Sequence, residues 1–255
     1  MSFLAAWGWL LITLPPLLYL QRWITRHIQI IFQLLVQHDQ IAIVLNQLLF
    51  IPGVLVHETS HWLMAKLVGA RTVGFSIWPQ RQDDGTLRMG FVQTERVDFV
   101  REALIGVAPL LAGSGVVVLI SYSRLAAGDV GGALALGDLA LAAERLRLAD
   151  TRDLLVWLYF LFTLSNTMLP SASDRRAWPT VVLLLAILGG LLAYLGVGPL
   201  VEESFGELIA VTVRIIAGAF TITILLDLLA FPLVFAVEWL LWQWVGPRLL
   251  EKYDQ

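Results

Sequence analysis

Long apolar stretches separated by short polar segments dominate the chain. The apolar stretches comprise residues 3–20, 40–69, 99–122, 153–170, 179–199 and 207–246. A membrane-spanning helix needs about 20 mainly apolar residues, so each stretch has the length of a crossing or nearly so. The pattern predicts an all-α polytopic membrane protein with a bundle of about six transmembrane helices.

Two parts of the chain leave the number of helices open. The stretch 207–246 is long enough for two crossings, but Pro232 is equally consistent with a kink in one long helix. Residues 22–38 have a short apolar centre and basic flanks. That combination favours an interfacial amphipathic helix over a membrane crossing.

The polar segment between the second and third apolar stretches has the pattern of strands. In residues 72–93, β-branched and aromatic side chains flank Asp84 and Gly85. Asp-Gly is a favoured pair at the tight turn of a β-hairpin. We therefore predict a small β-hairpin here, whereas residues 124–150, rich in Ala, Gly and Leu, are expected to form a long connection.

Composition supports the membrane class and excludes several kinds of site. The chain is 58% hydrophobic and 15% charged, whereas soluble domains carry charge at about 25% of positions. It has no cysteine, so a metal would have to be held by His, Asp, Glu or backbone oxygen. The basic residues are dispersed and the net charge is -3, so the expected partner is a lipid bilayer and not nucleic acid.

The second apolar stretch is interrupted by His57, Glu58 and His61, in the sequence VLVHETSHWLMAKLVGA. Histidines four residues apart share one face of a helix, so both rings can bind one zinc ion. Glu58 is rotated by about 100° from His57, which places it beside a metal-bound water as a general base. The alternative is three polar residues satisfied by neighbouring helices, which is unfavourable because an acidic residue at membrane depth costs about 2.5–3.5 kcal/mol.

A catalytic zinc site takes three protein ligands and a water, so a third ligand is required. His27 and His38 have a suitable side chain, but they lie near the ends of the expected interfacial helix, where solvated histidines are the better interpretation. Asp174 follows an apolar stretch and lies eight residues after Asn166. On spacing alone, a zinc ligand and a solvent-facing acid paired with the next two arginines are equally good interpretations of Asp174.

With these motifs in place, the sequence resembles the site-2 protease family of intramembrane zinc metalloproteases. The first match is HETSHWLMAKLVG, where Ala65 and Gly69 follow HExxH at the family's intervals. The second is NTMLPSASD, where Asn166 and Asp174 keep the separation of the family's Asn-Pro-Asp motif. A third, weaker match is ALIGVAPLLAG, which has Ala-Pro in place of the family's Gly-Pro.

The resemblance covers about residues 45–176 and implies three zinc ligands, which are His57, His61 and Asp174. It implies that Glu58 is the catalytic acid–base residue. It also suggests that Asn166 hydrogen-bonds the substrate backbone or the oxyanion, although a helix–helix hydrogen bond is an equally good interpretation. The hairpin could add an extended substrate segment at its edge, or it could only cap the bundle.

The function implied by the resemblance is a zinc metalloendopeptidase that cleaves transmembrane protein substrates in a prokaryotic cytoplasmic membrane. We expect three regions: an N-terminal membrane helix with an interfacial segment (1–39), a catalytic membrane core (40–176) and C-terminal transmembrane helices (177–255). Ser173 and Arg175 beside the acid depart from the family pattern, as does Trp62. These departures allow an alternative, which is a catalytically inactive relative that binds membrane helices as a chaperone or regulator.

A metal-binding channel or transporter is a third interpretation. Glu58 favours the enzyme, because transport or helix binding has no evident need for an acid beside the metal-bound water. Arg214, Asp227 and Glu238 lie in the last apolar stretch. They are explained equally well as the lining of a substrate gate or water path and as paired structural polar groups. The sequence assigns none of them to the site.

Overall fold

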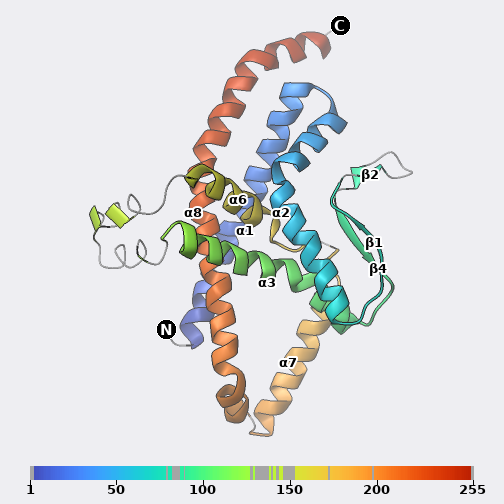
Figure 1. The fold of residues 1–255 in the computed structure, drawn as a ribbon, viewed down its shortest axis with the longest axis vertical. Helices are drawn as coiled ribbons and strands as arrows, with labels where there is room; N and C mark the ends of the chain where they lie inside the picture. The colour runs from blue at the N-terminus through green and yellow to red at the C-terminus, as the bar shows by residue number, and fades with distance from the viewer. Residues whose placement is uncertain are drawn as a thin grey trace.

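Long helices and one small region of strands make up the fold (Figure 1). The computed structural model describes residues 3–253 except 79, 82–86, 89, 127–128, 130–137, 139, 142–143, 146–152, 172 and 197. The described helices are α1 (Phe3–Val36), α2 (Asp39–Leu67), α3 (Phe99–Arg124), α6 (Leu154–Thr167), α7 (Trp178–Tyr194) and α8 (Gly198–Tyr253). The strands are β1 (Thr72–Ser76), β2 (Gln80–Arg81), β3 (Leu87–Arg88) and β4 (Phe91–Thr94).

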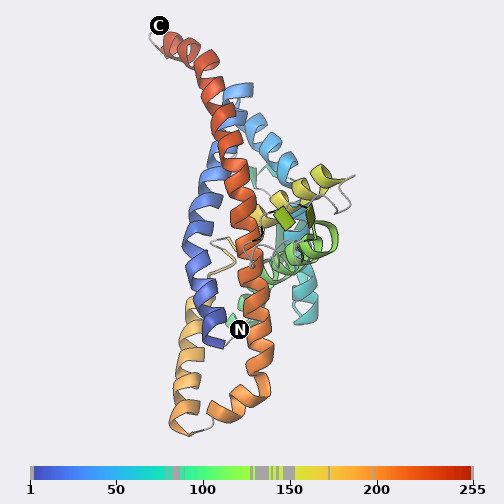
Figure 2. The same ribbon diagram turned by 90° about the vertical axis from the view of Figure 1, so that its left-hand side faces the viewer.

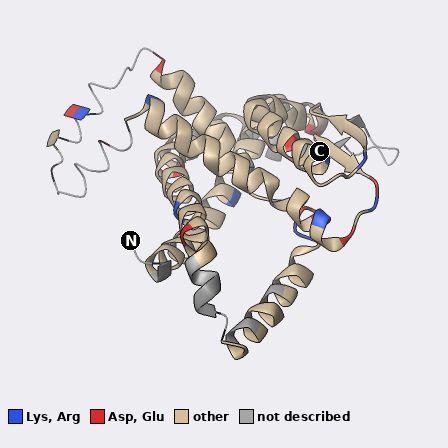
Figure 3. Cartoon of the chain, turned by 60° about the horizontal axis from the view of Figure 1, so that its bottom comes forward, with Lys and Arg blue, Asp and Glu red and all other residues tan. Residues whose placement is uncertain are grey.

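Three of the described helices are long and apolar enough to cross a membrane, which are α2, α3 and the part Ser204–Val245 of α8. α6 has 14 residues and α7 has 17, so at about 1.5 Å per residue both are shorter than a hydrocarbon core of about 30 Å. Charged residues are sparse along the described parts of the helices (Figure 3). The predicted helical, membrane-type character is therefore confirmed for three helices, and a bundle of six crossings remains a prediction.

α1 and α8 pack along each other and run in the same direction (Figure 2). The indole Nε1 of Trp9 donates to Thr221 Oγ1 over 3.0 Å, and further along both helices His27 pairs with Glu238. From the first contact to the second, the residue number increases on both helices, so the two helices are parallel. The first and last helices of the chain thus pack against each other.

The interfacial helix predicted for residues 22–38 is wrong as a separate element. Residues up to Val36 continue α1 without a break. Ile24 and Ile28 are buried and pack against Phe50 of α2, together with side chains of α8. This tertiary burial keeps the segment in the bundle although its composition is amphipathic.

α8 is a single helix of 56 residues that includes Pro232. The question left open by the sequence is therefore answered, because no loop divides residues 207–246 into two crossings. The exposed side chain of Pro232 points away from the packed face of α8. A proline in a helix interior removes one backbone hydrogen bond without necessarily ending the helix.

The predicted β-hairpin is confirmed as a small antiparallel pair. β1 pairs with β4, with Thr72 opposite Thr94 and Ser76 opposite Phe91. β2 pairs with β3 in the same sense. The expected Asp-Gly turn lies outside the described residues, as does most of the connection predicted for residues 124–150.

Candidate metal centre

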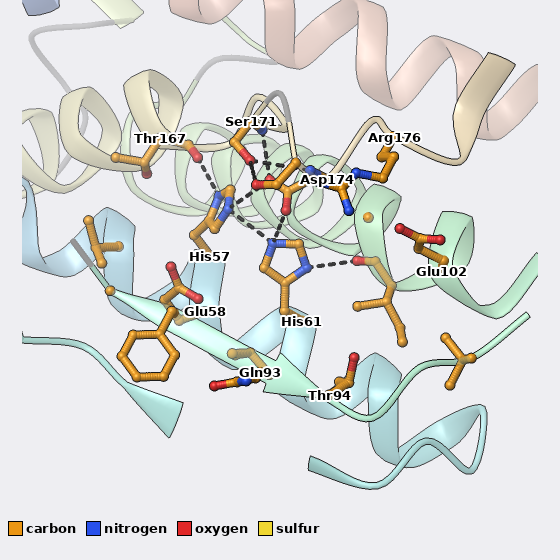
Figure 4. Close-up of a pocket in the computed structure, with 18 of the residues that line it drawn as sticks. His57, Glu58, His61, Gln93, Thr94, Glu102, Thr167, Ser171, Asp174 and Arg176 are labelled. Carbon is orange, nitrogen blue, oxygen red and sulfur yellow. Dashed lines mark hydrogen bonds and ion pairs between the residues drawn. The ribbon is translucent and has the colours of Figure 1, made fainter. Parts of the chain in front are cut away.

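Three side chains with metal-binding atoms converge beside the strands. His57 and His61 come from successive turns of α2, and Asp174 comes from the loop between α6 and α7 (Figure 4). One ligand atom from each residue lies within 4.8 Å of the others. The structure therefore brings together the three residues that the sequence proposed as zinc ligands.

Backbone carbonyls fix the orientation of both imidazoles. The Nδ1 atom of His57 lies 2.7 Å from the carbonyl oxygen of Thr167, and Nδ1 of His61 lies 2.8 Å from that of Ile105. A carbonyl oxygen only accepts, so each Nδ1 carries the hydrogen. In the neutral rings the lone pair is then on Nε2, which is the arrangement that metal-binding histidines need.

The facing atoms have the spacing of a tetrahedral metal site. Nε2 of His61 lies 3.1 Å from Nε2 of His57 and 3.4 Å from Oδ1 of Asp174. Nε2 of His57 lies 3.7 Å from Oδ2 of Asp174. Two nitrogens at about 2.0–2.1 Å from a tetrahedral zinc ion lie about 3.3 Å apart. The donor set therefore fits a metal ion with the ligand distances of zinc, which these three side chains would hold.

The loop that carries Asp174 is held in place from two sides. The Ser171 N–H donates to Asp174 Oδ2 over 2.7 Å, and the Asp174 N–H donates to Ser171 Oγ over 3.3 Å. On the other side the loop backbone lies against α3 at Gly106, where a Cβ would overlap the Asp174 carbonyl oxygen. Only glycine leaves room for the loop to come this close to α3.

The Asp174 carboxyl is held in its ionised form. Its burial acts to raise the pKa, but the hydrogen bonds that the His57 and His61 imidazoles donate when Nε2 carries a proton, together with the one from the Ser171 N–H, outweigh burial and hold the pKa well below the usual range. Asp174 is therefore an anion at neutral pH, and it can supply charge as well as an oxygen to a bound cation.

Glu58 lies beside His57, on the side of the cavity that faces β4 (Figure 4). Its side chain is buried, with 7% exposure. The chain approaches it closely at Gly90, where a Cβ would lie 3.1 Å from Glu58 Cγ and 3.2 Å from Oε1. Glu58 is thus next to the candidate centre but outside the ligand group, as the sequence predicts for a general base.

A cavity of about 710 Å³ connects these residues. Its walls are formed by α2, β4, the first turns of α3 and the α6–α7 loop, and polar side chains such as Gln93, Glu102 and Arg176 line it. β4 is paired with β1 on one edge, and Phe91 to Thr94 of β4 line the cavity. The candidate centre therefore lies in a cavity that is lined in part by polar side chains and on one side by β4.

Asn166 is not brought to this cavity. Its Nδ2 donates to Oδ1 of Asp227 on α8 over 2.9 Å and to the Phe162 carbonyl over 3.0 Å. Among the described residues, those that line the cavity do not include Asn166. Of the two arrangements that the sequence left open, the structure has the helix–helix hydrogen bond.

The other histidines also lie away from the centre. His27 pairs with Glu238 between α1 and α8 and stacks on Trp23. His38 precedes α2 at its N-cap position. Neither belongs to the His57, His61 and Asp174 group, so the choice of Asp174 over these histidines agrees with the geometry.

Comparisons of the chain with protein family models, with curated proteins and with solved structures give no match. The resemblance to the site-2 protease family therefore stays a prediction from the motifs. The metal centre is supported by the geometry of the three side chains and their carbonyl partners.

Proposed function

We propose that the protein is a zinc-dependent intramembrane endopeptidase that hydrolyses peptide bonds of membrane-anchored substrate proteins. The observation that carries the proposal is the convergence of two Nε2 atoms and one carboxylate, with Glu58 beside them. Three protein ligands with an open fourth position are typical of catalytic zinc, whereas structural zinc has four protein ligands. A neighbouring carboxylate outside the ligand set supplies the general base.

The roles of the side chains follow from their positions. Zinc, when bound, lowers the pKa of a bound water to about 7 and polarises the substrate carbonyl. Glu58 accepts a proton from the attacking water and gives a proton to the leaving amine as the C–N bond breaks. The Thr167 and Ile105 carbonyls keep both imidazoles in the tautomer that binds the metal.

The substrate of such an enzyme is a membrane helix, and its peptide bonds are protected by hydrogen bonds within the helix. It must become extended before cleavage. The strand β4 could hold the extended segment. Its residues line the cavity, and within the described strands only one of its edges is paired, to β1. An added substrate strand would be held by main-chain hydrogen bonds.

The alternative of a catalytically inactive relative rests on the departures around Asp174. Arg175 is exposed, and its Nε donates to the Ser171 carbonyl over 3.2 Å, within the loop. Ser173 shares a hydrogen bond with Ser171 over 2.7 Å. Neither side chain displaces a ligand atom of the group, so the departures leave the proposed chemistry intact. Zinc binding by the wild type without cleavage of any membrane-anchored substrate would favour the alternative.

The test compares wild type, Glu58→Gln and Glu102→Gln in liposomes that contain a single-span substrate protein. Glu58→Gln should reduce the cleavage rate by a factor of about 10² to 10⁴, which is the usual contribution of a general base, and should keep the zinc. Glu102→Gln removes another carboxylate from the wall of the same cavity and should cleave at a rate near that of wild type. Cleavage by Glu58→Gln at the wild-type rate would refute the mechanism.

A further inference from the structure

Asp227 is a fully buried acid in the middle of the apolar helix α8, with 0% exposure. None of the ion pairs between described residues includes it. Its Oδ1 accepts from Asn166 Nδ2 over 2.9 Å, whereas Asp227 Oδ2 and Asn166 Oδ1 have no hydrogen-bond partner. Burying a carboxyl group with half of its hydrogen-bonding capacity unused is costly, so its presence calls for a function.

The partner of Asp227 is next in sequence to a residue that holds the metal centre. Asn166 precedes Thr167, the last residue of α6, and the Thr167 carbonyl accepts from His57 Nδ1 over 2.7 Å. The last carbonyls of a helix have no donor within the helix, so outside contacts decide their position. Asp227 does not bond one of these carbonyls; it accepts from the Asn166 side chain and so fixes the residue before Thr167, whose carbonyl orients the His57 ring.

A second close contact holds the same end of α6 from the side of α2. Gly53 lies against Thr163 and Thr167, and a Cβ at this position would overlap the Thr163 carbonyl oxygen and the Thr167 hydroxyl. The end of α6 therefore contacts two helices: α2, which carries the two histidines, and α8, which carries Asp227. A displacement of α6 away from α8 would move the Thr167 carbonyl relative to His57.

We propose that Asp227 is a positioning residue for the metal centre, because its hydrogen bond to Asn166 holds the end of α6 where the Thr167 carbonyl orients His57. The inference rests on the metal centre of the proposed function and does not depend on peptide hydrolysis. It gives a role to a buried hydrogen-bond acceptor in α8 that lies outside the ligand group. A residue that only stabilised helix packing would change the stability of the protein but not the geometry of the bound metal.

The test measures zinc affinity by competition with a chelator, together with the visible absorption spectrum of the cobalt-substituted protein. Asp227→Leu has the same number of side-chain heavy atoms in the same branched arrangement but no acceptor, so we expect zinc affinity about tenfold lower, the low end of the range for groups that orient metal ligands. The cobalt spectrum should also change. Asp227→Asn keeps an oxygen that accepts from Asn166 and should restore both properties.

The matched control is Thr223→Val. Thr223 lies one turn before Asp227 on α8 and is equally buried, but its hydroxyl donates to the Ala219 carbonyl of its own helix over 2.9 Å. We expect this variant to keep the wild-type zinc affinity and cobalt spectrum. A folded Asp227→Leu protein with the wild-type affinity and spectrum would overturn the proposal, and so would a Thr223→Val protein altered to the same degree.

If Asp227→Leu does not fold, two other variants test whether the hydrogen bond between Asn166 and Asp227 positions the metal centre. Asn166→Asp places two carboxyl groups together and should weaken zinc binding, whereas Asn166→Asp combined with Asp227→Asn restores one donor and one acceptor and should recover it. Failure of the double variant to recover would overturn the positioning role. A wild type that binds no metal would refute the centre itself, a result distinct from a metal-binding protein in which Asp227 has no effect.

Discussion

Nε2 of His57 and Nε2 of His61 lie 3.1 Å apart, and both face the same space because the Nδ1 atoms of the two rings donate to backbone carbonyls; in neutral rings both Nε2 atoms carry a lone pair. Two lone pairs at this distance repel each other unless a positive charge lies between them. The carboxylate of Asp174 adds a third acceptor to the same space. A metal ion bound between these atoms would remove the repulsion, so the stability of the protein should depend on that ion.

Removal of the metal should destabilise the protein. A ligand that binds only the native state at a concentration of 100 times its Kd stabilises that state by about 2.7 kcal/mol. Treatment with a zinc chelator should thus lower the midpoint of thermal unfolding in detergent, and added zinc should restore it. The Asp174→Ala protein provides the control, since the chelator should have little effect on it. An equal effect of the chelator on both proteins would show that the stabilising metal binds elsewhere.

Replacement of Asp174 by alanine should weaken zinc binding by more than about 100-fold, which exceeds the effect expected for groups that only orient a ligand. The reason is the loss of one ligand atom together with the negative charge that Asp174 brings to the centre. Zinc per chain, measured in purified protein, provides the test. Glu102→Gln controls for the loss of any acid from the cavity. Unchanged zinc in Asp174→Ala would mean that another residue supplies the third ligand.

A methyl group at position 106 should weaken metal binding although residue 106 is not a ligand. In Gly106→Ala, the Cβ would meet the Asp174 backbone, so the loop must move away from α3. We expect weaker zinc binding and a loss of stability of about 1–3 kcal/mol, as for other overpacked sites.

Gly115 is the matched control for Gly106, because it lies on the same helix and a Cβ there would meet nothing within 4 Å. Gly115→Ala should leave zinc binding unchanged, and alanine should favour the helix by up to about 1 kcal/mol. Equal zinc affinities for the two alanine variants would show that the close approach of the Asp174 loop to α3 does not position the ligand.

The ligand group could be predicted because its members carry local signals. The spacing of His57 and His61 places both on one helix face, and the resemblance of residues 166–174 to the family's Asn-Pro-Asp motif implies Asp174 as the third ligand, whereas spacing alone does not. The groups that orient these ligands carry no such signal. The Thr167 and Ile105 carbonyls belong to the backbone, which every residue has, so their role appears only when α6 and α3 are seen against α2.

Contacts between distant segments account for the other differences. Asp227 is an isolated polar residue in an apolar helix and Asn166 lies between Ser165 and Thr167 at the end of another, but nothing in the sequence pairs the two. The same holds for residues 22–36, where the flanking arginines favoured an interfacial helix. The burial of Ile24 and Ile28 against α2 and α8, which is a tertiary property, makes this segment part of α1.

The length of α8 has a consequence for how the protein sits in a bilayer. The apolar part Ser204–Val245 has 42 residues, which span about 63 Å, roughly twice the thickness of a hydrocarbon core. Even at a tilt of about 40°, the upper end of the usual range, such a helix extends about 48 Å along the membrane normal. If α8 crosses the bilayer, some of its leucine- and tryptophan-rich surface must emerge from the lipid tails into the headgroup region or beyond.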